Sequence, residues 1–144
     1  EAPVLAAIRE ELHLCRVETA GDFSTASKLM EEQRFDLVIL DIMGVRGFEL
    51  LDAAVAKKLP AVMLTAHAMT PESLQEAVNR GAVSFLPKEE LHRLSELTAE
   101  ILEQVDQGKT HWSKLVGRLG PRFRELWGEA WEEIKFPPNS KISW

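Results

Sequence analysis

The sequence contains no tyrosine and a single cysteine, Cys15. One cysteine excludes an internal disulfide framework and is typical of proteins in a reducing compartment, so we expect a cytoplasmic protein. Because Cys15 begins a short run that is expected to form a strand, we expect a packed thiol rather than a reactive one. No apolar run approaches the roughly 18 residues that a membrane span needs, and the N-terminus lacks the basic region of a signal peptide.

Positive charge is also scarce. The 144 residues include 17 Lys and Arg against 23 Asp and Glu, which gives a net charge of −6. This balance argues against broad electrostatic binding to DNA or to an anionic membrane, so we expect neither as a direct partner. Hydrophobic residues make up 45% of the sequence, enough for the core of one domain of ordinary size with a small appendage.

Two kinds of pattern alternate over the first hundred residues. Helical spacing or helix caps occur over residues 3–12, 22–33, 48–55, 70–81 and 91–105. Short apolar runs that are typical of strands occur over residues 15–19, 35–41, 61–65 and 83–86. This alternation predicts an α/β domain with a doubly wound parallel sheet and helices on both faces.

Polar residues follow three of these predicted strands. Asp41 ends the run Phe35–Asp41, Thr65 ends the run 61–65, and Lys88 comes directly after the run 83–87. The carboxyl ends of parallel strands are where open α/β sheets bind ligands and carry out chemistry. An acid, a hydroxyl and an amine at successive strand ends predict a small site that can hold a phosphoryl group.

The predicted order begins with a helix, whereas a doubly wound domain begins with a strand near the centre of its sheet. A sheet without that strand would expose the backbone groups of its neighbours. We therefore expect further residues upstream of Glu1.

Three local strings carry a family resemblance: residues 36–47 (DLVILDIMGVRG), 62–66 (VMLTA) and 81–88 (GAVSFLPK). In this order and spacing, the chain resembles the receiver domain of two-component response regulators over about residues 1–106. The resemblance implies a flavodoxin-like five-stranded sheet of order 2-1-3-4-5, whose first strand is missing from this sequence. It divides the chain into a receiver domain, residues 1–106, and a Trp-rich helical C-terminal extension, residues 107–144.

The resemblance also assigns roles. It implies that Asp41 is the phosphoacceptor, which takes a phosphoryl group from a sensor histidine kinase or a phosphotransfer protein. Thr65 would hydrogen-bond one phosphoryl oxygen and Lys88 would ion-pair with another. Phe85 matches the aromatic residue whose rotation reports phosphorylation, so the surface of residues 66–106 would change and bind a downstream target protein.

Mg²⁺ is the cofactor that the resemblance implies. Asp41 and the backbone carbonyl of Met43 would be ligands, together with an acidic pair that ends the family's first strand. That pair is absent from the sequence, so we expect it upstream of Glu1. His67 matches the position that tunes hydrolysis of the acyl phosphate. One departure is that Glu89, rather than the family's usual proline, follows the lysine.

Three functions compete. The leading one is a single-domain phosphoacceptor switch that acts by protein contact and is not an enzyme beyond its own phosphorylation and dephosphorylation. A pseudo-receiver that never takes phosphate and only binds a partner is the second. A phosphatase of the haloacid dehalogenase type is the third, but it needs a second aspartate where Met43 stands. Residues His13, His92 and His111 share no ligand spacing, so no zinc site is expected.

Each functional assignment has a structural alternative. Asp41 could cap a helix, Thr65 suits a strand, and Phe85 could be a core residue. His67 could be a solvated loop histidine. Arg46 could neutralise the phosphate, but a surface arginine is the favoured interpretation.

The C-terminal extension holds all four tryptophans: Trp112, Trp127, Trp131 and Trp144. Its glycines and Pro121 predict short pieces, with a helix that begins at Pro121 and ends before Pro137. One apolar face is predicted for that helix, made of Phe123, Leu126, Trp127, Ala130, Trp131 and Ile134. This face could pack on the receiver as an extra core layer, or bind a partner or a second copy in a homodimer. The positive charge of the extension's basic residues is balanced by glutamates, so we do not expect the extension to bind DNA.

Overall fold

The structure is a computed structural model of the chain that describes residues 2–41, 46–65, 70–137 and 142. Its first half contains α1 (Ala2–Glu11), α2 (Phe23–Glu32), β1 (Val38–Asp41), α3 (Gly47–Ala56) and β2 (Ala61–Thr65). The second half contains α4 (Pro71–Asn79), β3 (Ser84–Pro87), the 3₁₀ helix η1 (Lys88–Arg93), α5 (Leu94–Asp106), α6 (Trp112–Trp127) and a second 3₁₀ helix, η2 (Gly128–Glu133). No helix in these described ranges has the length and apolar character to cross a membrane.

The described strands form one parallel sheet of order β1-β2-β3. Asp41 pairs in register with Leu64, and Thr65 pairs with Pro87. The carboxyl ends of the three described strands therefore lie next to one another. The predicted α/β class with a parallel sheet and flanking helices is confirmed, although the described residues form three strands rather than five.

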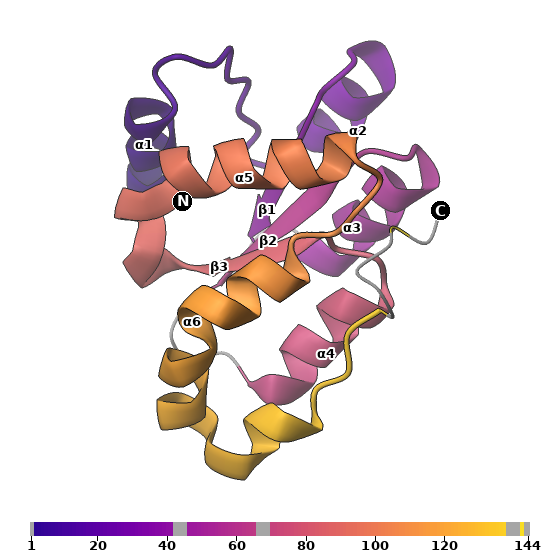
Figure 1. Ribbon diagram of the computed structural model, residues 1–144. Helices are drawn as coiled ribbons and strands as arrows, with labels where there is room; N and C mark the ends of the chain where they lie inside the picture. Colours follow the sequence, from indigo (N-terminus) through magenta and orange to yellow (C-terminus); the bar gives the residue numbers. More distant parts are fainter. Residues whose placement is uncertain (1, 42–45, 66–69, 138–141, 143–144) are drawn as a thin grey trace.

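Successive residues of the strands point to opposite faces of the sheet, and each face is covered by helices (Figure 1). On one face, Val62 and Leu64 pack against α1 and α5. On the other face, Met63 and Phe85 pack with α2, α3, α4 and the C-terminal extension. The sheet is thus the middle layer of three, and the polar residues Asp41 and Thr65 lie at the ends of its strands.

The prediction of a strand over residues 15–19 is wrong. The backbone after α1 is irregular here, and Cys15 is exposed, so the expectation of a packed thiol is wrong as well. A strand requires a neighbouring strand to complete its hydrogen bonds, and no described segment pairs with these residues. The β-branched residues of this segment indicate a preference for strand, but they cannot show whether a partner strand is present.

Helix boundaries follow the predicted caps. The side chain of Asp22 accepts a hydrogen bond of 2.7 Å from the backbone N–H of Thr25 and caps α2. Thr70 caps α4 in the same way, with Pro71 in the first turn. After α4 the chain turns at Gly81, which has a φ of +103°.

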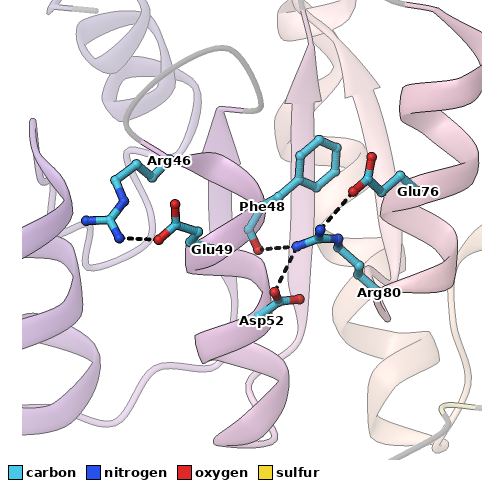
Figure 2. Close-up of polar contacts among 6 residues, drawn as sticks. All are labelled: Arg46, Phe48, Glu49, Asp52, Glu76 and Arg80. Carbon is cyan, nitrogen blue, oxygen red and sulfur yellow. Dashed lines mark hydrogen bonds and ion pairs between the residues drawn. The ribbon is translucent and has the colours of Figure 1, made fainter.

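A polar cluster fixes α4 against α3 (Figure 2). The Arg80 guanidinium lies 2.8 Å from Asp52 on α3 and 2.8 Å from Glu76 on α4, and it donates to the carbonyl of Phe48 at 3.5 Å. The side chain of Arg80 therefore links the two helices that follow β1 and β2.

The C-terminal extension forms one longer helix where short pieces were predicted. Helix α6 runs from Trp112 to Trp127 with Pro121 inside it, so the prediction of a helix start at Pro121 is wrong. An internal proline costs about 3 kcal/mol, and burial of Trp112, Leu115 and Phe123 offsets this cost. The predicted apolar face is also only partly right, because Leu126 is 53% exposed.

Candidate functional site

The candidate site lies where the three strands end. Asp41 is the last residue of β1, Thr65 is the last residue of β2, and Lys88 directly follows β3. Lys88 Nζ donates a hydrogen bond to Asp41 Oδ2 across 3.1 Å. The sequence separation of this pair is 47 residues, so the parallel sheet is what brings the acid and the amine together.

The acid and the amine are partly exposed. The side chain of Asp41 is 24% exposed and that of Lys88 is 22% exposed. Thr65 is buried and stands at the end of the middle strand, between the strands that carry the other two. Its register with Pro87, the residue before Lys88, places Thr65 next to the lysine's own strand end.

The backbone before Lys88 is rigid. Pro87 has a φ of −65°, which its ring fixes, and Lys88 then begins the 3₁₀ helix η1. The direction in which Lys88 leaves the strand is therefore set by the end of β3, which is buried on both faces.

Met43, His67 and Glu1 lie outside the described residues. Among the residues that the structure does describe, no three His, Cys, Asp or Glu side chains converge as metal ligands. Of the residues that the structure describes at the strand ends, Asp41 could supply a carboxylate ligand, and Mg²⁺ would need further oxygen ligands.

Arg46 is engaged elsewhere. Its guanidinium pairs with Glu49 on α3 and lies 3.9 Å from the ring centroid of Phe23 on α2. Glu49 hydrogen-bonds the guanidinium, which raises the pKa of Arg46. This geometry supports the interpretation of Arg46 as a surface arginine (Figure 2).

Phe85 is 1% exposed and belongs to the core below the site. Its ring makes an edge-on contact with Phe123 of α6, with centroids 5.7 Å apart and an interplanar angle of 73°. The predicted signalling residue is thus in direct contact with the C-terminal extension. Its role in switching remains a prediction.

Sequence reasoning missed a buried chain of polar side chains beside β3. Ser84 Oγ lies 2.7 Å from His111 Nδ1, and His111 Nε2 lies 3.2 Å from Glu100 Oε1 on α5. Arg118 of α6 pairs with the same glutamate. Burial lowers the pKa of His111 below its ordinary value, while Glu100 acts in the opposite direction.

The order serine, histidine, carboxylate is that of a hydrolase triad. However, Ser84 and His111 are fully enclosed, at 1% and 0% exposed, so no substrate can reach the hydroxyl. These hydrogen-bonded side chains link β3, α5 and the start of α6. The sequence signals them only by a lone histidine before an apolar helix, and that signal is too weak to predict the contacts.

Comparisons with known proteins agree with this geometry. The family model of the response regulator receiver domain matches residues 2–102. A search of curated proteins found no match. The solved structure of NtrX from Brucella abortus in complex with ADP is 26% identical with a TM-score of 0.62, covering 83% of this chain and 28% of that one.

A second similar structure is a response regulator protein from Burkholderia pseudomallei with a phosphorylated aspartic acid, a calcium ion and citrate. It is 18% identical with a TM-score of 0.55, covering 85% of this chain and 81% of that one, and this likeness shows the fold. This chain therefore spans well under half the length of NtrX and most of the length of the Burkholderia protein. The family match extends over more than half of the sequence, so the chain belongs to the response regulator receiver domain family.

Proposed function

We propose that this protein is a phosphoacceptor switch of a two-component system, with Asp41 as the residue that takes the phosphoryl group. The observation that carries the proposal is the 3.1 Å contact between Lys88 Nζ and Asp41 Oδ2 at the edge of a parallel sheet. A carboxylate oxygen can act as a nucleophile toward phosphorus, and the ammonium group beside it can stabilise the charge of the transferring phosphoryl group.

In the proposed step, a carboxylate oxygen of Asp41 forms a bond to phosphorus as the N–P bond of a phosphohistidine breaks. The electron pair of that bond returns to the imidazole of the donor, a sensor histidine kinase or a phosphotransfer protein. Lys88 stabilises the negative charge on the phosphoryl oxygens as it is transferred, and the hydroxyl of Thr65 donates to another of these oxygens.

A divalent cation, Mg²⁺, is part of the proposal. The Burkholderia protein of the same fold holds a calcium ion together with its phosphorylated aspartic acid. Asp41 would supply one ligand here, and the backbone carbonyl of Met43 another. His67 would tune hydrolysis of the acyl phosphate.

We propose a switch rather than an enzyme with its own substrate, acting in the cytoplasm on a downstream target protein. A pseudo-receiver that binds a partner without taking phosphate is the alternative. It is favoured by one observation, that among the described residues no three His, Cys, Asp or Glu side chains converge as metal ligands.

The test is to incubate the protein with acetyl phosphate and Mg²⁺ and to measure intact mass over time. We expect addition of one phosphoryl group to the wild type and none to Asp41→Asn. Asp36→Asn is the matched control, because Asp36 is an exposed aspartate five residues earlier and should leave the modification unchanged. An unmodified wild type, or equal modification of Asp41→Asn, would favour the pseudo-receiver.

A further inference from the structure

The receiver part of the chain and the C-terminal extension carry opposite net charges. Residues 1–106 contain 10 Lys and Arg against 19 Asp and Glu, a net charge of −9. Residues 107–144 contain 7 Lys and Arg against 4 Asp and Glu, a net charge of +3. Complementary charge of this kind favours contact between the two parts and fixes how they meet.

Two arginines of α6 face three glutamates of the receiver. Arg118 pairs with both Glu96 and Glu100 of α5. Arg122, one helical turn later, lies 3.9 Å from Glu90 of η1. The side chains of Glu90 and Glu100 are only 13% and 16% exposed, so salt screens their charges less than those of free surface groups. We call these three glutamates the acidic rim.

An apolar stripe runs along α6 beside the arginines. Leu115, Leu119 and Phe123 follow one another at intervals of four residues, and all three are buried. They pack in the same core as Phe85 of β3 and Val78 of α4. Helix α6 therefore presents two adjacent stripes to the receiver, one apolar and one basic.

Helix α6 and the segment after it lie against α5, β3 and α4 (Figure 1). The backbone N–H of His111 donates across 2.8 Å to the carbonyl of Val83, just before β3, which is an edge strand of the described sheet. The Gln75 side chain of α4 accepts a hydrogen bond of 2.7 Å from the N–H of Lys135 and donates one of 2.9 Å to its carbonyl. The chain's own extension thus occupies the surface that α4, β3 and α5 form.

We propose that this surface is the docking site for an amphipathic helix of a target protein, and that the extension is an autoinhibitory element that occupies it. The occupant seen in the structure defines the chemistry of the target helix. It has apolar residues at positions i, i+4 and i+8, the last of them aromatic, and arginines at i+3 and i+7 that meet the acidic rim. The inference deepens the proposed function, on which it rests, by naming the kind of target.

A target helix has to compete with a segment that is tethered to the surface. The tether gives α6 an effective concentration of about 1 mM, so a free helix of equal affinity does not displace it at micromolar concentration. The charge pairs with the acidic rim can be weakened without changing the receiver surface or the apolar stripe. Weakening them in the tethered helix should therefore open the site to a helix added in solution.

The probe is a fluorescently labelled synthetic peptide of residues 109–127, added to the full chain without acetyl phosphate. In the double variant Arg118→Glu, Arg122→Glu, the tethered helix repels the acidic rim. We expect the peptide to bind this variant at least about 10-fold more tightly than the wild type in fluorescence anisotropy. Circular dichroism checks that the variant is folded. Arg118→Met removes one charge but keeps an apolar stem, and it should show a smaller gain if the double variant does not fold.

Arg124→Glu is the matched control. Arg124 lies on the same helix, but it is 63% exposed and pairs with Glu132 of the extension rather than with the receiver. This variant should bind the peptide no better than the wild type. A peptide that itself carries Arg118→Glu and Arg122→Glu should bind none of these proteins, because its charge no longer complements the acidic rim.

Three outcomes would overturn the inference. One is equal binding of the peptide to the wild type and to the folded variants, and another is no binding to the folded variants at about 1 mM peptide. The third is association of two wild-type copies in analytical ultracentrifugation, which would make a second copy the occupant. None of these measurements needs a phosphoryl group, so each of these failures would leave the phosphoacceptor role of Asp41 intact.

Discussion

Lys88 and Asp41 come from opposite edges of the described sheet and still meet, because Lys88 reaches back across the end of β2. Both side chains are about one quarter exposed. Solvent screening makes such a pair a small contribution to stability, on the order of 1 kcal/mol or less. On the proposed function, the pair serves the chemistry at Asp41 more than the stability of the fold.

The variant Lys88→Met separates these two roles. We expect the rate of Asp41 phosphorylation by acetyl phosphate to fall by about 10²-fold, because a charge that stabilises the transferring phosphoryl group is removed. The free energy of unfolding should change by less than about 1 kcal/mol. Lys57→Met, at an exposed lysine after α3, should change neither quantity. A large loss of stability with an unchanged rate would make Lys88 a structural residue.

His111 makes the stability of the protein depend on pH. Burial lowers its pKa in the folded state, although Glu100 opposes this, so the folded state binds fewer protons than the unfolded state below the ordinary histidine pKa of about 6.5. Stability is therefore present above that pH and is lost as the pH falls toward the lowered value.

Urea unfolding at a series of pH values measures this effect. Wild type should lose more stability on acidification than His111→Gln, whereas His92→Gln, at an exposed histidine on η1, should follow the wild type. If the free energy of unfolding falls equally with pH in the wild type and in His111→Gln, the buried histidine does not contribute to the pH dependence.

At the scale of elements, the turn after α4 depends on a glycine. Gly81 has a φ of +103°, and a Cβ there would lie 3.1 Å from Cγ2 of Val55 on α3. Gly81→Ala should therefore lower the free energy of unfolding by about 1–3 kcal/mol. Gly21→Ala is the control, since a Cβ at Gly21 meets nothing within 4 Å, and it should change stability by less than about 0.5 kcal/mol. Equal effects in urea denaturation would contradict the strain argument.

Local signals in the sequence predicted most elements of the receiver part. Asp22 and Thr70 cap helices that begin within the predicted ranges 22–33 and 70–81, and β2 has the predicted bounds Ala61–Thr65. The errors arose where tertiary contacts override local preference. Residues 15–19 lack a described partner strand, and Pro121 is carried inside α6 because the helix buries its aromatic residues on the sheet.

At the scale of the whole molecule, the C-terminal extension is part of one core. Trp112, Phe123 and Trp131 are buried together with residues of α3, α4 and the sheet, so packing on the receiver describes the extension better than an exposed docking face. The sequence left these alternatives open, because an apolar helical face has the same pattern whether it covers its own domain or a partner.

A shared core predicts cooperative unfolding. Tryptophan fluorescence reports on the extension and far-ultraviolet circular dichroism reports on all helices, and the two urea curves of the unphosphorylated protein should coincide. A fluorescence transition at lower urea would show that the extension unfolds independently of the receiver.

The candidate site could be predicted in part. The strand-end pattern of Asp41, Thr65 and Lys88 was visible in the sequence, and the contact between the acid and the amine follows from parallel strands in register. The Ser84–His111–Glu100 chain was not predictable, since it depends on how the extension turns around the edge of β3.

Peptide-level mass spectrometry after treatment with acetyl phosphate and Mg²⁺ shows whether Asp41 is the phosphoacceptor. We expect one phosphoryl group, labile to base, on the peptide that contains Asp41, and none on that peptide in Asp41→Asn. A phosphoryl group on any other residue, or a wild-type protein that stays unmodified under conditions that phosphorylate another receiver domain, would contradict it.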